Sequence, residues 1–269
     1  MYRFFISAFG DEIANDLDTQ LRILIENNVE YIEFRGADGK GVANITLTEM
    51  QEMAKRISDK NIKVSCVSSP IGKIPIEDDF NQHFDLYKNI VEKAHILNTK
   101  YIRLFSFYVP EGDEDTYKDI VIERLSKFTD YAKSEDVIIL HENEKGIYGN
   151  TPERCLNILK SINSKNLRAI FDPANFVQCN VETFPHAFSL LKDFIEYMHI
   201  KDALFKDGSV VPAGYGDGRV KNIIDELKKM NFNGFLSIEP HLNNNLPGGG
   251  PENFKKALSA LLNIIKEGE

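Results

Sequence analysis

The sequence predicts an α/β fold, a (β/α)8 or TIM barrel that forms a single domain over residues 1–269. Two observations lead to this prediction: segments of strand and helix character alternate from end to end, and eight of them are of strand type. The length agrees with it, because barrels of about 250 residues fold as one domain. No Pro/Gly/Ser-rich linker divides the chain.

Eight short apolar runs account for the strands. Runs of this kind, bounded by turn residues, are typical of parallel strands that are buried on both faces. In chain order they are Arg3–Ala8, Tyr31–Phe34, Lys63–Val67, Tyr101–Phe107, Val137–Leu140, Leu167–Phe171, Ile195–Ile200 and Gly234–Ile238. Because consecutive parallel strands need a crossover connection, a helix is expected in each interval.

Helical periodicity and capping residues mark these intervals. Thr48, Asp79 and Thr151 each precede a segment of helical pattern and are predicted N-caps, the last with Pro152 in the first turn. The glycine-rich segment 247–251 follows the eighth strand and is predicted to form a loop over the barrel mouth. The local signals thus agree with the alternation that predicts the barrel.

Composition narrows the cellular setting and the partners. The net charge of −9 makes the average surface repel phosphate backbones, so no nucleic-acid partner is predicted. No apolar run approaches the length of a membrane span, and the N-terminal stretch turns acidic too early for a signal peptide. The three cysteines are odd in number and show no CxxC pair, which favours buried thiols in a reducing compartment. The sequence therefore predicts a cytoplasmic protein with no membrane partner.

Four of the later apolar runs end in a residue that can bind a metal. Glu142 follows the fifth run, Asp172 the sixth and Glu239 the eighth, while His199 lies near the end of the seventh. The carboxyl ends of parallel strands meet at one end of a barrel, so these side chains are expected to converge. Taken singly, each acidic residue is explained equally well as a helix cap or a turn former. Four equivalent positions favour a shared site.

The chemistry of this set points to one divalent ion. Three carboxylates and one imidazole suit Mn²⁺ or Mg²⁺ better than a thiolate-bound structural zinc, and Co²⁺ or Zn²⁺ are also compatible with it. Four protein ligands on an ion that prefers about six leave two positions for neighbouring oxygens of a substrate. A hydroxyketone or a hydroxyaldehyde fits this arrangement.

Several segments resemble a known family. HENEKGIYGNTPE (141–153), IFDPAN (170–175), MHIKDA (198–203) and GFLSIEPHL (234–242) are similar to the xylose isomerase-like TIM-barrel superfamily, in particular to its sugar phosphate isomerase/epimerase and ketose 3-epimerase branches. SSPIGK (68–73) and RLFSF (103–107) resemble earlier stretches of the same proteins. The resemblance covers nearly the whole chain and is more specific for the fold and the metal site than for the substrate.

The resemblance implies that Glu142, Asp172, His199 and Glu239 bind one divalent ion. It also implies that Glu142 and Glu239 are the catalytic acid/base pair, one on each side of the substrate carbon. In such a reaction the ion polarises a carbonyl and stabilises an enediolate, while one carboxylate removes a proton and the other returns it. The expected activity is isomerisation or epimerisation of a sugar, a sugar phosphate or a related keto-polyol, and the expected partner is a small-molecule carbohydrate.

Four further residues are candidates for substrate binding. Lys201 lies two residues after His199 and points the same way on an extended strand. Glu33 and Arg103 interrupt apolar strands, where a buried charge needs a partner or an open mouth, so they either pair with each other or bind sugar hydroxyls. His241 follows the last metal-ligand candidate in the adjoining loop.

A phosphorylated substrate would need a basic or glycine-rich anion pocket. Lys73, Arg35 and the segment 214–218 are the candidates for one. The same segment lacks the GxGxxG spacing of a dinucleotide site, so it is expected to form a turn near the site.

Other functions stay open at this stage. A dehydratase, that is, a lyase acting on a keto-inositol or a sugar acid, would use the same ion, and a non-catalytic sugar-binding barrel would need the ion without an acid/base pair. An AP endonuclease is less favoured, because the segments 65–69 and 103–107 lack the further histidines that its three-metal site needs. A homo-oligomer is compatible with such a barrel, whose outer helices can associate.

Overall fold

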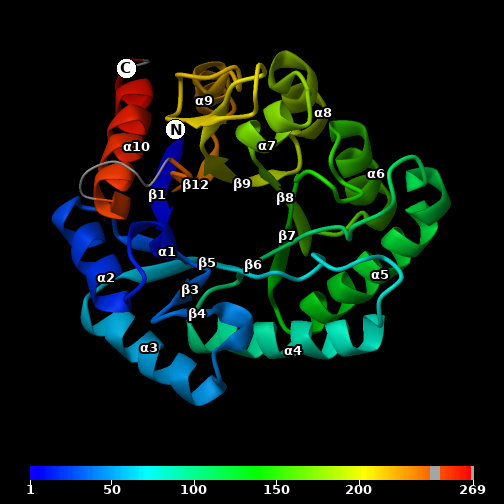
Figure 1. The fold of residues 1–269 in the computed structure, drawn as a ribbon, viewed down its shortest axis with the longest axis horizontal. Coiled ribbons are helices and arrows are strands. Elements are labelled where there is room, and N and C mark those ends of the chain that lie inside the picture. The colour runs from blue at the N-terminus through cyan, green and yellow to red at the C-terminus, as the bar shows by residue number, and fades with distance from the viewer. Residues whose placement is uncertain (243–248, 268–269) are drawn as a thin grey trace.

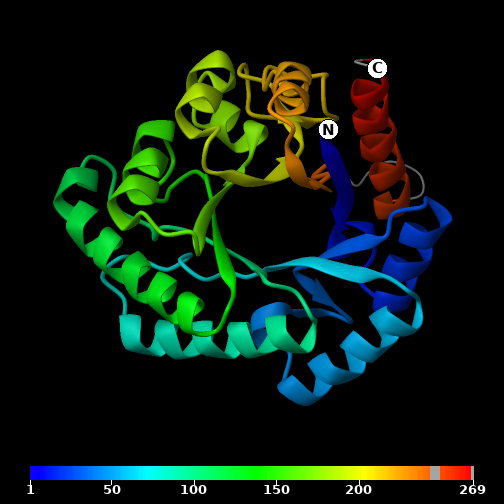
Figure 2. The same cartoon turned by 180° about the vertical axis from the view of Figure 1, so that it is seen from behind.

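Eight parallel strands close into a barrel, and helices lie around it, as the sequence predicts (Figure 1 and, from behind, Figure 2). This computed structural model describes residues 1–242 and 249–267. Around the barrel the strand order is β1, β12, β9, β8, β7, β6, β5 and β2, and β2 pairs with β1 to close the ring. The chain is therefore a TIM barrel.

The barrel strands occupy nearly the predicted segments. They are β1 (Arg3–Phe9), β2 (Tyr31–Phe34), β5 (Lys63–Ser68), β6 (Tyr101–Leu104), β7 (Ile138–Glu142), β8 (Leu167–Phe171), β9 (Ile195–Ile200) and β12 (Asn233–Ile238). Two short hairpins lie outside the barrel sheet, namely β3 (Gly36–Ala37) with β4 (Lys40–Gly41) and β10 (Asp202–Ala203) with β11 (Val210–Val211).

Helices follow the strands along the chain. They are α1 (Gly10–Ile13), α2 (Leu17–Glu26), α3 (Leu47–Asp59), α4 (Phe80–Ile96), α5 (Glu114–Ser134), α6 (Pro152–Ile162), α7 (Pro173–Gln178), α8 (Phe188–Leu191), α9 (Val220–Lys229) and α10 (Gly249–Lys266), with short turns at η1 (Val42–Asn44) and η2 (Thr183–Ala187). Within the described part of the chain, no helix combines the length and apolar character that a membrane crossing needs.

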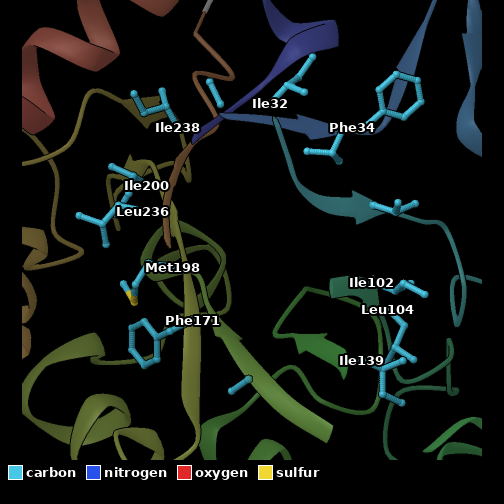
Figure 3. Close-up of a cluster of buried hydrophobic side chains, with 14 of the residues drawn as sticks. Ile32, Phe34, Ile102, Leu104, Ile139, Phe171, Met198, Ile200, Leu236 and Ile238 are labelled. Carbon is cyan, nitrogen blue, oxygen red and sulfur yellow. The ribbon is translucent and has the colours of Figure 1, made fainter. Parts of the chain in front are cut away.

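Alternation along each strand separates the main core from the barrel interior. In β9, Met198 and Ile200 are buried in the large apolar cluster that lies between the strands and the helices. Figure 3 shows part of this cluster. His199, which lies between these two residues in the sequence, faces the barrel interior instead. A smaller cluster that includes Cys66 and Tyr197 fills the interior. The barrel interior is thus packed with side chains, and His199 is one of those that face inward.

Local signals explain where several helices begin. The predicted caps are confirmed at Asp79, whose side chain accepts the N–H of Asn81, and at Thr151, which caps α6. The prediction at Thr48 is wrong, because α3 begins at Leu47 and is capped by a reciprocal capping box of Thr46 with Glu49. That motif satisfies two backbone N–H donors at once.

Two predicted boundaries also differ from the structure. Residues 249–251 of the predicted glycine-rich loop form the first turn of α10, and 243–248 lie outside the described residues. β6 ends at Leu104, before the predicted end of the fourth strand, and Phe107 has a φ of +66°, which a strand does not continue. The N–H of Phe107 instead donates to the carbonyl of Gly72, which brings Lys73 against Phe105.

Candidate metal and substrate site

Four side chains with metal-binding atoms meet at the carboxyl ends of four neighbouring strands. Glu142 is the last residue of β7, Asp172 joins β8 to α7, His199 lies in β9, and Glu239 follows β12. One ligand atom from each lies within 4.8 Å of the others, and all four residues are buried. The strands that carry them are adjacent in the barrel order, which explains the convergence.

Asp172 serves both as a helix cap and as part of the cluster. Its Oδ1 accepts the N–H of Asn175 at 2.9 Å and so caps α7. The other oxygen, Oδ2, lies 3.8 Å from Nδ1 of His199. An acidic residue at a strand end can be a helix cap or a metal-ligand candidate. Asp172 is both, since a carboxylate has two oxygens.

The imidazole of His199 is held from both sides. Its Nδ1 lies 2.9 Å from Oε1 of Glu142 and 3.9 Å from Oε2 of Glu239. Its Nε2 lies 3.1 Å from Oε1 of Glu33, whose carboxylate also accepts the hydroxyl groups of Ser68 and of Tyr197. Nδ1 thus faces the carboxylate cluster, and Glu33 fixes the ring from behind.

The ionisation of the cluster follows from how closely its members lie. Burial lowers the pKa of His199, but the charges of Glu142 and Glu33 outweigh it and raise that pKa to about 10. Burial raises the pKa of Asp172 to about 7, against the charge of Lys201. The pKa of Glu142 falls to about 2, because the charges of His199 and Arg103 outweigh burial. The negative charge of these carboxylates therefore favours a cation at the place where the four side chains meet.

The residues present fit a divalent cation. Oε2 of Glu142 and Oδ2 of Asp172 are buried and accept no hydrogen bond from the described residues, and their contacts are ion pairs with Arg103 at 3.2 Å and with Lys201 at 3.0 Å. Buried acceptors without a donor are costly unless a cation or another donor satisfies them. The donor set of three carboxylates and one imidazole is the one that hard divalent ions take. The imidazole nitrogen that such an ion would use is Nδ1 of His199, because Nε2 is engaged by Glu33.

A cavity of about 340 Å³ opens above the cluster. Glu142 and Glu239 line it, whereas Asp172 and His199 do not. Of the residues predicted to bind substrate, Arg103, Lys201 and His241 line it. Glu33 does not, since its side chain is 0% exposed and lies behind the imidazole of the cluster.

Two of the cavity-lining cations, Lys201 and Arg103, are each paired with carboxylates of the cluster. Nζ of Lys201 lies 2.6 Å from Glu239 and 3.0 Å from Asp172. Arg103 pairs with Glu142 at 3.2 Å, so the suggested pairing of Arg103 with Glu33 is wrong. Lys201 and Arg103 therefore neutralise carboxylates of the cluster.

Two residues at the rim of the cavity complete the surroundings of Glu239. Nδ1 of His241 lies 3.3 Å from Oε1 of Glu239. The guanidinium of Arg35 lies 2.7 Å from Asp11, 2.7 Å from Glu12 and 3.0 Å from Glu239. Glu12, Glu239 and His241 also form a second group with ligand spacing. Because Arg35 pairs with both glutamates of that group, the positive charge there is already supplied by the protein.

The glycine-rich segment after β11 is organised by one buried carboxylate. Asp202 accepts the backbone N–H groups of Gly214 and Gly216 on one oxygen and those of Gly218 and Ala203 on the other, all within 3.0 Å. These N–H groups are therefore engaged within the protein. The segment 214–218 is a turn near the site, as predicted, and its glycine amides do not form an open anion pocket.

Two asparagines in the site were not anticipated. The side chain of Asn143 bonds to both the N–H and the carbonyl of Asp172, and Nδ2 of Asn175 donates to Oε1 of Glu142. Both lie within the segments that carry the family resemblance, so their presence in those motifs was the available signal. They hold two carboxylates of the cluster in place.

A parallel barrel with a buried carboxylate and histidine cluster at its carboxyl end defines the class of this protein. The sequence model of the family described as xylose isomerase-like TIM barrel matches residues 21–264, and the chain belongs to that family. An uncharacterised protein of Methanocaldococcus jannaschii, MJ1311, is 26% identical over 187 residues. That match covers 67% of this chain and 62% of the relative, so the chain spans less than two thirds of that protein.

Solved structures share the fold over almost the entire chain. An IOLI protein with a bound zinc atom has a TM-score of 0.83 at 17% identity, covering 99% of both chains. A D-tagatose 3-epimerase-like protein has a TM-score of 0.77 at 19% identity, covering 98% of this chain and 99% of that one. The probable 3-DHS dehydratase AsbF from Bacillus anthracis has a TM-score of 0.76 at 17% identity, covering 97% and 99%. At these identities the likeness shows the fold.

Proposed function

We propose that the protein is a divalent-metal-dependent isomerase or epimerase of a sugar, a sugar phosphate or a related keto-polyol. The observation that carries this proposal is the convergence of Glu142, Asp172, His199 and Glu239 below a cavity of small-molecule size. Membership of the xylose isomerase-like family and the fold shared with an epimerase-like protein support it. The cytoplasm is the proposed location, and the three cysteines are free thiols.

One ion is proposed at this cluster. Hard oxygen ligands favour Mn²⁺ or Mg²⁺, and the single imidazole also admits Co²⁺ or Zn²⁺. The IOLI protein, which shares the fold, binds a zinc atom, and this supports a cation in a barrel of this kind. When bound, such an ion would polarise a carbonyl of the substrate and make the neighbouring C–H more acidic.

Proton transfer is assigned to Glu142 and Glu239. They are the two members of the cluster that line the cavity, so they are the two that a substrate can touch. Arg103 pairs with Glu142, and Lys201 pairs with Glu239, which favours the ionised form of both carboxylates and keeps each ready to accept a proton. Return of the proton to the neighbouring carbon gives isomerisation, and return to the original carbon on the opposite face gives epimerisation.

Substrate contacts are assigned to Arg103, Lys201 and His241, which line the cavity. Lys201 has an ammonium group beside Glu239, where it can hold a substrate oxygen as charge develops on it. Glu33 is assigned to orienting His199, because its carboxylate is buried and bonded to the imidazole.

Solvent deuterium exchange tests this proposal. With Mn²⁺ or Mg²⁺ present, we expect exchange at a carbon next to the carbonyl in a ketose, a ketose phosphate or a keto-inositol, and none after chelation. Glu239→Gln should lower the exchange rate by about 10²- to 10⁴-fold, the usual contribution of a positioned acid or base. Glu196→Gln is a matched control, because this carboxylate lies on β9, the strand that pairs with β12 in the barrel, but it bonds to Tyr101 instead of the cluster.

The product separates the remaining candidates. Loss of water would indicate a dehydratase, for which the fold shared with a probable dehydratase is the supporting observation. Metal-dependent binding of a sugar without exchange would indicate a non-catalytic sugar-binding barrel. Exchange that persists in Glu239→Gln would contradict the assigned acid/base pair.

A further inference from the structure

We propose that the substrate of this site is an anion, whose carboxylate or phosphate group is bound by a basic wall formed by Lys73, Arg103 and Lys145. All three residues line the cavity. This inference rests on the proposed function, since it names the substrate class for the same site. Its basis is the distribution of charge and of unsatisfied donors around the cavity.

Positive side chains outnumber negative ones in the lining of the cavity. Five lysines and arginines line it against three glutamates, although the chain as a whole carries a net charge of −9. Two of those glutamates, Glu142 and Glu239, belong to the cluster that would hold the ion. A neutral polyol needs hydroxyl and amide partners but no excess of cations, whereas an anion is attracted by one.

Three of the five cations pair with buried acids of the cluster, and of these Arg103 does so only through NH1. Arg35 is surrounded by three carboxylates, and Lys201 lies between Asp172 and Glu239. The glycine amides of segment 214–218 are bonded to Asp202. Arg35, Lys201 and the glycine amides are therefore engaged by groups of the protein itself. The basic wall is the remaining candidate for the anion pocket.

The basic wall is built on the ring of Phe105. Nζ of Lys73 lies 4.1 Å from the centre of that ring, and the guanidinium carbon of Arg103 lies 4.8 Å from it. The ring is fully buried, so the two cations share an apolar base. Charge interactions are stronger beside such a surface than in water.

Arg103 provides a second, independent sign of a ligand. It is only 6% exposed, and its Nε is buried without a hydrogen-bond partner among the described residues. A buried charged donor without an acceptor is unfavourable, and an oxyanion in the cavity would satisfy it. Its NH1 lies 3.2 Å from Glu142, so the basic wall adjoins the metal-ligand cluster.

The two lysines are available to the same oxyanion. Lys145 forms no ion pair with any residue that the structure describes. Lys73 has one partner, Glu144, at 3.2 Å. A planar carboxylate and a tetrahedral phosphate both present several acceptor oxygens to such a group of donors, so a sugar acid and a sugar phosphate are the two sources of this chemistry.

Calorimetric titration of the Mg²⁺-loaded protein tests the basic wall with three probes. Inorganic phosphate and D-gluconate are the anions, and sorbitol is the neutral counterpart of gluconate. We expect at least one anion to bind about tenfold or more tightly than sorbitol. The double variant Lys73→Gln/Lys145→Gln should weaken that anion about tenfold and leave sorbitol unchanged. Tighter binding of phosphate would indicate a sugar phosphate as the substrate, and tighter binding of gluconate would indicate a sugar acid.

Lys88→Gln is the matched control. Lys88 also pairs with a carboxylate, Asp85 at 2.9 Å, and lies over an aromatic ring, Phe84, but it is on the outer helix α4. Its titration curves should equal those of the wild type. Lys145→Gln alone, at an exposed position, gives a second test that does not disturb packing.

Three results would overturn the proposal: sorbitol binding as tightly as both anions, no binding of either anion, or anion affinity unchanged in the double variant. The last would mean that the anion binds elsewhere. The outcome is independent of the exchange experiment. Metal-dependent exchange in neutral ketoses without anion binding removes only this inference, whereas anion binding at the basic wall without exchange in any compound removes only the proposed activity.

Discussion

At the scale of single residues, a buried histidine supports the loop that carries part of the basic wall. Nε2 of His83 accepts the N–H of Gly72 at 2.8 Å, next to Lys73. Only the unprotonated nitrogen can accept this bond. Burial, with the charge of Arg124, lowers the pKa of His83 to about 4. The folded protein therefore keeps this imidazole neutral at a pH where the unfolded chain protonates it.

This difference predicts a loss of stability in mild acid. His83 takes up its proton at a pH near 6.5 when unfolded and near 4 when folded, so its contribution is complete above 6.5 and is lost as the pH falls toward 4. At pH 5 the loss is about 2 kcal/mol, since each unit of separation is worth about 1.4 kcal/mol. Urea unfolding of the wild type and of His83→Gln at pH 7 and pH 5 measures it.

The comparison between the two proteins isolates this group from the other titrating residues. The free energy of unfolding should fall more steeply from pH 7 to pH 5 in the wild type than in His83→Gln, by about the same 2 kcal/mol. Equal slopes would mean that His83 is protonated alike in both states and does not hold Gly72 through a neutral nitrogen.

Residue types and strand ends were enough to predict which side chains meet, but not which atoms pair. Glu142, Asp172, His199 and Glu239 each follow or end an apolar run, and the parallel barrel brings such positions together. The partner of Arg103 depends on the register between β6 and β7. The sequence suggested Glu33 or sugar hydroxyls as partners, whereas the structure pairs Arg103 with Glu142 on β7. Contacts of this kind are set by tertiary packing.

At the scale of elements, Asp202 joins the hairpin β10–β11 to the turn that follows it. Four backbone N–H groups point at its fully buried carboxylate. A side chain at Gly216 would meet Oδ1 of Asp202 at 2.4 Å and the carbonyl of Ala203 at 2.5 Å, so only glycine permits this approach. The spacing of glycines in segment 214–218 is thus explained by one internal anion.

Asp202→Asn should therefore destabilise the protein. The amide keeps one acceptor oxygen, but its NH₂ group would face two N–H donors, and the charge that strengthens the bonds is lost. We expect a loss of about 1–3 kcal/mol in the free energy of unfolding, the usual cost of buried donors left unsatisfied. Asp207→Asn is the control, because it changes an exposed aspartate of the same hairpin loop. Equal unfolding curves for both variants would contradict this role of Asp202.

Element boundaries show where local sequence signals suffice. Asp79 and Thr151 were predictable as caps because a capping side chain acts on residues two or three positions ahead. The start of α3 was misplaced by two residues, since Thr46 and Thr48 are both acceptable caps and only Thr46 has a glutamate three positions on. The early end of β6 depends on the neighbouring loop at Gly72, which no local pattern in β6 reveals.

At the scale of the whole molecule, the proposed ion would tie together four strands. β7, β8, β9 and β12 each contribute one ligand and form half of the closed ring. The fold itself was predictable because a fully buried parallel sheet leaves continuous apolar runs in the sequence. Stability should then depend on the ion, because it binds a cluster that exists only when these strands are assembled.

Thermal unfolding with and without Mn²⁺ measures this dependence. At an ion concentration of about one hundred times the Kd, stabilisation is about 2.7 kcal/mol, which raises Tm by roughly 5–10 °C for a domain of this size. Chelation should reverse the shift. Asp172→Asn should abolish it, because the variant removes one charged ligand of the buried cluster while Asn can still cap α7.

The same variant distinguishes the two groups of residues with ligand spacing. Asp172 belongs to the buried cluster and not to the group of Glu12, Glu239 and His241. A full shift of Tm in Asp172→Asn would therefore place the ion at that second group, in spite of the guanidinium of Arg35. Loss of the shift places it at the four strand ends, because Glu239 and His241 are unchanged in the variant and only the buried cluster has lost a ligand.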